Sequence, residues 1–118
     1  MLGEMDHDEA RLLLAREVLG EDGIVVMVRM AQDISPKRLN RLLEALDALA
    51  EHAGFALTID RETAALAWRL GFLFHDQATS WKDQPVIAMS YRIVEKIEAL
   101  FAVEQMEERT LQRYRGSL

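Results

Sequence analysis

The sequence contains no cysteine. This absence excludes a disulfide, a thiol nucleophile and a zinc site built on cysteine ligands. Long hydrophobic runs are missing as well: Ala64–Trp68 and Leu70–Phe74 are among the longest, and they are separated by Arg69. Both are far shorter than the roughly 20 apolar residues that a membrane-spanning helix needs. We therefore expect no association with a membrane.

Sequence motifs for targeting and catalysis are also lacking. The first ten residues contain no basic side chain and no apolar segment of the kind found in a signal peptide. We expect a cytoplasmic protein of bacterial type. There is no glycine-rich phosphate loop, nucleophile elbow, HExxH motif or EF-hand loop, so the sequence calls for no cofactor. Whether the protein is an enzyme stays open at this stage.

The composition is that of a globular protein with an acidic balance. The chain has 118 residues, half of them hydrophobic and 29% charged, and we expect one domain over residues 1–118. The net charge of −6 is carried mainly by residues 1–34, which hold eight acidic and three basic residues. An acidic N-terminal third argues against non-specific binding of nucleic acid, which depends on clustered lysine and arginine.

The clearest element is a helix over Ser35–Gly54. Ser35 can cap the free N–H groups, Pro36 suits the first helical position, and Gly54 can take the left-handed conformation that ends a helix. The apolar residues fall on one stripe of a helix with 3.6 residues per turn: Leu39, Leu42, Leu43, Leu46, Leu49, Ala50 and Ala53.

Three further helices are predicted from capping residues and apolar spacing. One covers Asp6–Leu19, with Asp6 as its N-cap. A second begins after Asp60 and is apolar nearly all round, so we expect it at the centre of the domain. The last begins at Pro85 and extends to about Tyr114. Beyond Val103 its apolar positions are sparse, so this end is either solvated or packs on another subunit.

The segment Asp22–Met30 leaves the fold class open. Its β-branched residues favour a strand buried on both faces, and Phe55–Ile59 is a second short strand candidate. The main prediction is therefore an α+β domain, mainly helical, with about four helices and a short two-strand βαβ element. The alternative is an all-α five-helix bundle in which 22–33 form a helix, because periodicity alone does not separate the two.

Three basic residues, Lys37, Arg38 and Arg41, lie in the first turns of the helix that begins after Ser35. Positive charge at this end opposes the helix dipole. A bound anion or an acidic partner would account for these residues. Salt bridges to the acidic first helix would also account for them, and they are the simpler explanation.

The dipeptide His75-Asp76 follows an apolar helical run in LGFLFHDQ. This pattern resembles the central motif of the HD-domain metal-dependent phosphohydrolases. In that family both residues bind a metal ion that activates a water molecule for attack on a phosphoester. The preceding helix would supply another histidine ligand in that family, but this chain has Arg38, Asn40 and Arg41 there.

Two functions follow from these observations. The first is a small non-enzymatic interaction or regulatory protein that acts on a protein partner through its helical surfaces. The exposed edge of the predicted sheet and the long last helix indicate a homodimer. The alternative is an HD-like phosphohydrolase, or a metal- or ligand-binding domain, centred on His75 and Asp76.

Overall fold

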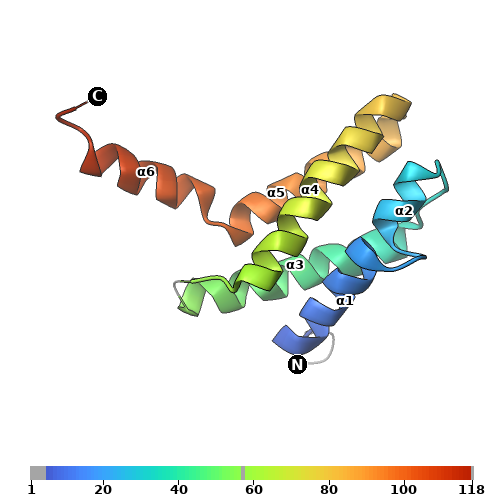
Figure 1. Cartoon of the computed structure of the whole chain (residues 1–118), viewed down its shortest axis with the longest axis horizontal. Coiled ribbons are helices and arrows are strands. Elements are labelled where there is room, and N and C mark those ends of the chain that lie inside the picture. The colour runs from blue at the N-terminus through green and yellow to red at the C-terminus, as the bar shows by residue number, and fades with distance from the viewer. Residues whose placement is uncertain (1–4, 57, 118) are drawn as a thin grey trace.

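The computed structural model describes residues 5–56 and 58–117, and these residues form helices joined by short loops, with no strand among them (Figure 1). The helices in chain order are α1 (His7–Leu19), α2 (Ile24–Arg29), α3 (Pro36–Ala56), α4 (Arg61–Trp81), α5 (Gln84–Leu100) and α6 (Val103–Arg113). No helix in the described part of the chain is long and apolar enough to cross a membrane.

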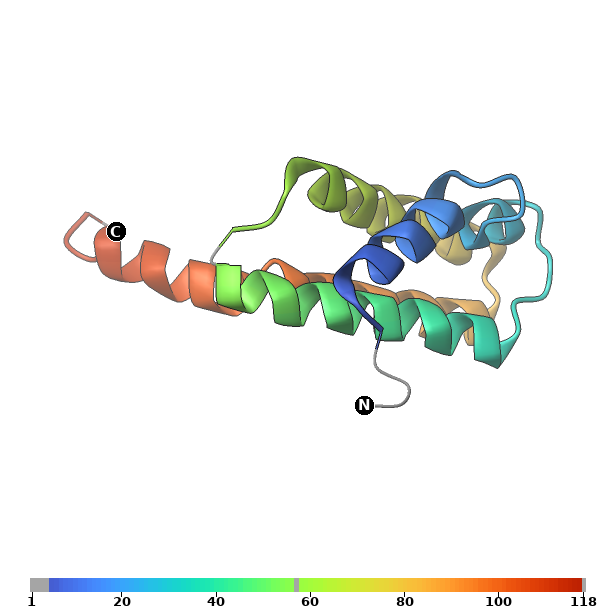
Figure 2. The ribbon, with the colours of Figure 1, turned by 90° about the horizontal axis from the view of Figure 1, so that it is seen from below.

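The first five helices pack around one core. α3 and α5 lie side by side, α4 packs along α5, α1 packs on α3 and α4, and α2 packs on α4 (Figure 2). α6 extends away from this bundle beyond the end of α5 (Figures 1 and 2). The largest completely buried apolar side chains are Leu14, Ile24, Val28, Leu42, Leu46, Leu49, Leu70, Phe74 and Ile93.

The predicted strand at Asp22–Met30 is wrong, because Ile24–Arg29 form helix α2. Ile24, Val25 and Val28 are buried, at the spacing of one helical face. The backbone groups at both ends of α2 also find tertiary partners. The Ile24 N–H donates to the Glu17 carboxylate at 3.1 Å, and the Val28 carbonyl accepts from the Trp81 indole at 2.8 Å. These contacts with groups outside the segment override the preference of β-branched residues for strands.

The second predicted strand, Phe55–Ile59, is wrong as well. Phe55 and Ala56 complete α3, Leu57 lies outside the described residues, and Thr58 and Ile59 belong to the loop before α4. The βαβ element is therefore replaced by the all-α alternative, with a helix within 22–33 as that alternative required.

Gly54 lies inside α3 and does not end it. A Cβ atom added there would meet nothing within 4 Å. Gly54→Ala is therefore expected to raise the free energy of unfolding by about 0.5–1 kcal/mol, because alanine loses less conformational entropy in a helix than glycine.

Urea denaturation measures this effect, and Gly71→Ala in α4 is the matched control. A Cβ at Gly71 would lie 3.0 Å from Ile97 Cδ1 of α5, so crowding offsets the gain in helix propensity and this substitution is expected to stabilise the protein less than Gly54→Ala does. Equal effects of the two substitutions would contradict the close contact between α4 and α5 at Gly71.

Most predicted helix starts are confirmed. The Asp6 carboxylate accepts from the Glu9 N–H at 2.8 Å, Ser35 Oγ from the Arg38 N–H at 3.2 Å, and Asp60 from the Thr63 N–H at 2.9 Å. The hydrogen bond from the Thr63 N–H lowers the pKa of the Asp60 carboxyl group. Asp60 therefore stays ionised and continues to cap α4 in mildly acidic solution.

The last helix is not continuous, in contrast to the prediction for Pro85 to about Tyr114. It breaks after Leu100, where Ala102 has the left-handed φ of 50° and precedes α6. This break turns the chain away from the bundle.

Candidate interaction surface

Aromatic side chains are few in this protein, and most of them lie on its surface. The chain has eight phenylalanine, tyrosine and tryptophan residues. Five of them are close to half exposed or more: Trp68 at 64%, Phe72 at 57%, Trp81 at 51%, Tyr91 at 61% and Tyr114 at 48%. Single exposed apolar residues are common on protein surfaces, whereas a contiguous group of them indicates a contact site.

Four of the rings on α4 and α5 form such a group. Trp68 and Phe72, one helical turn apart on α4, are stacked with their centroids 5.2 Å apart and their planes 2° from parallel. His75 continues the same side of α4 and meets the edge of Tyr91 of α5 at 5.5 Å. We call Trp68, Phe72, His75 and Tyr91 the aromatic face.

The exposed aromatic face corrects the expectation that the helix after Asp60, which is apolar nearly all round, lies at the centre of the domain. Only one side of α4 packs against the bundle, where Leu66, Leu70 and Phe74 are buried. The opposite side carries Trp68 and Phe72. A sequence signal for this was present: Arg61 lies on the same stripe as Trp68 and Phe72, and Arg69 lies next to it.

A second apolar surface lies on α6. Val103, Met106, Thr110 and Leu111 fall on one side of the helix, which also carries Glu107, and Tyr114 continues this side past the helix end. We call Val103, Met106, Thr110, Leu111 and Tyr114 the α6 stripe. Met106 is 53% and Leu111 55% exposed, and no residue of α6 is buried.

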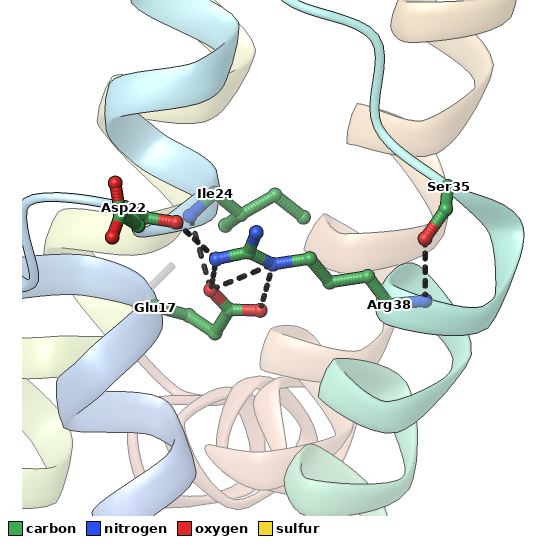
Figure 3. A network of polar contacts seen from close by, with 5 residues as sticks. All are labelled: Glu17, Asp22, Ile24, Ser35 and Arg38. Carbon is green, nitrogen blue, oxygen red and sulfur yellow. Dashed lines mark hydrogen bonds and ion pairs between the residues drawn. The ribbon is translucent and has the colours of Figure 1, made fainter.

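Arg38, one of the three predicted anion or partner contacts, has an internal partner. Its guanidinium donates to the Glu17 carboxylate from Nε at 2.9 Å and from Nη2 at 2.7 Å, and it also donates to the Asp22 carbonyl (Figure 3). Glu17 is only 6% exposed. The hydrogen bonds to Glu17 raise the pKa of Arg38 above its already high usual value. This pair joins α1, the loop before α2, and α3.

Arg41 and Lys37 lie on the outside of α3. Arg41 contacts Glu9 of α1 at 3.3 Å and Glu44 of its own helix at 3.4 Å. Lys37 is exposed, and within the described chain it takes part in no ion pair. The three basic residues thus do not converge on one point. Contact of these residues with an external anion or partner stays a prediction.

His75 and Asp76 are neighbours on α4 that face different surroundings. His75 Nδ1 lies 3.1 Å from Ser90 Oγ of α5, whereas Asp76 is exposed. Over residues 5–56 and 58–117, no three histidine, cysteine, aspartate or glutamate side chains are grouped closely enough to hold a metal ion. Metal binding at this dipeptide stays a prediction.

One hollow with mixed polar and apolar walls lies where α1, α3 and the start of α4 meet. Its lining includes His7 and His52, whose rings are stacked 3.8 Å apart, together with Arg11 and Asp60. Arg11 is already paired with Glu62 at 2.8 Å and with Asp60 at 3.5 Å. These contacts tie α1 to the start of α4 and pair the charges of Arg11 and Asp60 with each other.

Comparisons of the chain with known protein families, with curated proteins and with solved structures gave no match. The function is therefore inferred from the residues and their arrangement.

Proposed function

We propose that this protein is a non-enzymatic interaction or regulatory protein that binds a protein partner through its helical surfaces and works as a homodimer. The observation that carries the proposal is the aromatic face on α4 and α5. Trp68, Phe72 and Tyr91 are each more than half exposed, whereas Phe74 is the one fully buried aromatic side chain among those that the structure describes. Tryptophan and tyrosine dominate the binding energy of protein interfaces when they become buried there.

The packing of the rings also supports a binding role. The Trp68–Phe72 stack and the Tyr91–His75 contact restrict the rings before any partner arrives. A surface that is already ordered loses less conformational entropy on binding. The sheet edge that suggested a homodimer in the sequence is absent from the described residues, so support for the dimer now comes from the exposed α6 stripe.

Site-specific photo-crosslinking in the cells that make the protein tests the aromatic face. A photoreactive residue in place of Phe72 is expected to give one dominant crosslinked protein, and one in place of the exposed Glu44 of α3 is expected to give none. Trp68→Ala should raise the dissociation constant of the complex with that protein about tenfold. This corresponds to a loss of about 1.4 kcal/mol of binding free energy, which is typical of a side chain that contributes to an interface. The same products at both positions, or no product at Phe72, would contradict the proposal.

The alternative hydrolase function is supported by the helical surroundings of His75 and Asp76 but lacks a third metal ligand in the described residues. Native mass spectrometry of the purified protein reports both subunit number and retained ions. A metal-free dimer agrees with the interaction function, whereas a monomer that retains divalent ions favours the alternative.

A further inference from the structure

Another hollow lies at the end of the bundle where the loop between α2 and α3 comes close to the turn between α4 and α5 (Figures 1 and 2). Its volume is about 420 Å³, which is within the range of small-molecule sites. The walls are mainly apolar and include Ile34, Trp81, Val86 and Met89. The lining shares no residue with the aromatic face or with the hollow between α1 and α3.

The Trp81 ring is held in place as one wall of this hollow. Its indole N–H donates to the Val28 carbonyl at 2.8 Å, yet 51% of the residue stays exposed. An aromatic ring that is already fixed loses little conformational entropy when a ligand packs on it. The face of an indole ring also attracts a cation more strongly than the face of a tyrosine or phenylalanine ring does. Trp81 is therefore suited to a ligand that is both apolar and positively charged.

The charged groups that line the hollow are both carboxylates. They belong to Asp33, in the loop before α3, and to Asp83, the N-cap of α5. Asp83 accepts from the Val86 N–H at 3.3 Å. Among the described residues, neither aspartate takes part in an ion pair, and no basic residue belongs to the lining. The charge that the hollow offers to a ligand is therefore negative.

We propose that this hollow binds a small organic cation, an ammonium group carried on an apolar body. The ammonium group is attracted to Asp33 and Asp83, and the apolar body packs on Trp81 and Met89. An anion is repelled by both carboxylates, and a neutral apolar molecule leaves them without a counter-charge. The size of the hollow favours a free small molecule. The site is distinct from the aromatic face, so it adds a second binding activity to the proposed function.

Titration with phenethylamine, followed by NMR of the indole N–H groups, tests the proposal. At neutral pH this amine is a cation with an apolar ring, and phenethyl alcohol is its neutral counterpart of nearly the same shape. The amine is expected to shift the Trp81 indole signal to saturation, with a dissociation constant on the order of 1 mM. The alcohol is expected to bind about tenfold more weakly, because it offers the carboxylates and the indole face no positive charge.

Trp68 provides an internal control, because the chain has two tryptophans. Trp68 is the more exposed of the two, at 64%, but it belongs to the aromatic face and does not line the hollow. Its indole signal, assigned with Trp68→Phe, is expected to stay in place while that of Trp81 moves. If both signals shift with the same midpoint, the amine binds any exposed ring and the inference is overturned.

Asp33→Asn tests the role of the charge. It is expected to weaken binding of the amine about threefold and to leave binding of the alcohol unchanged. Asp83→Asn is expected to act in the same direction, since asparagine keeps the N-cap of α5. Glu51→Gln is the matched control, because it removes an exposed carboxylate near the other end of α3. It should leave the affinity for the amine unchanged.

Three results would overturn the inference: no shift of the Trp81 signal, equal affinities for the amine and the alcohol, or equal effects of Asp33→Asn and Glu51→Gln. None of them bears on the crosslinking at Phe72. Binding of a protein partner at the aromatic face is therefore judged separately from this site.

Discussion

Glu17→Ala is expected to lower the free energy of unfolding by about 3 kcal/mol. The Glu17 carboxylate is only 6% exposed and accepts hydrogen bonds from the Arg38 guanidinium and from the Ile24 N–H. Its removal leaves the partly buried Arg38 without its anionic partner and the first N–H of α2 without an acceptor. Loss of one member of a buried ion pair is far more costly than loss of an exposed pair.

Urea denaturation of Glu17→Ala and of Glu9→Ala provides the comparison. Glu9 also pairs with an arginine of α3, but its side chain is 51% exposed and the contact to Arg41 measures 3.3 Å. Glu9→Ala is therefore expected to change stability by less than about 1 kcal/mol. Similar losses in the two variants would show that the Glu17–Arg38 pair does not join α1, α2 and α3 as described.

Phe74→Ala is expected to have the largest effect on stability, a loss of about 3–5 kcal/mol. Phe74 is fully buried in the core, on the side of α4 that faces the bundle. Its truncation removes the apolar contacts of the ring and leaves a cavity that rigid helices fill only in part. Thermal and urea denaturation, followed by circular dichroism at 222 nm, measure the loss.

Phe72→Ala is the matched control, because Phe72 lies two residues away on the same helix and is 57% exposed. Its expected effect on stability is less than about 1 kcal/mol. A large loss of stability in Phe72→Ala would mean that the aromatic face belongs to the core, and the proposed binding role would lose its basis. The comparison of Phe74→Ala with Phe72→Ala thus distinguishes a phenylalanine needed for folding from one that is free to bind a partner.

The sequence alone determined the features that depend on neighbouring residues. The caps at Asp6, Ser35 and Asp60 were predicted correctly because a cap is formed by a side chain and an N–H group three positions away. The apolar stripe of α3 was predicted correctly because helical periodicity repeats within one segment: Leu39, Leu42, Leu46 and Leu49 are all buried.

The site was accessible to sequence reasoning only in part. The sparse apolar positions after Val103 indicated that this end of the chain either stays solvated or packs on another subunit, and the α6 stripe lies there. The aromatic face was missed, because an apolar helix gives no local sign of which side a neighbour covers. Arg38 was placed at a helix start, but its carboxylate partner lies 21 residues earlier in the chain.

Only the tertiary structure decided the state of Ile24–Arg29 and the exposure of Trp68 and Phe72. The β-branched segment is helical because Glu17 accepts from its first N–H group and Trp81 donates to its Val28 carbonyl. Both partners lie outside the segment, and a six-residue segment is too short for its own periodicity to choose between helix and strand. The physical reason is the same for the aromatic face: burial depends on which elements pack together, which no single segment encodes.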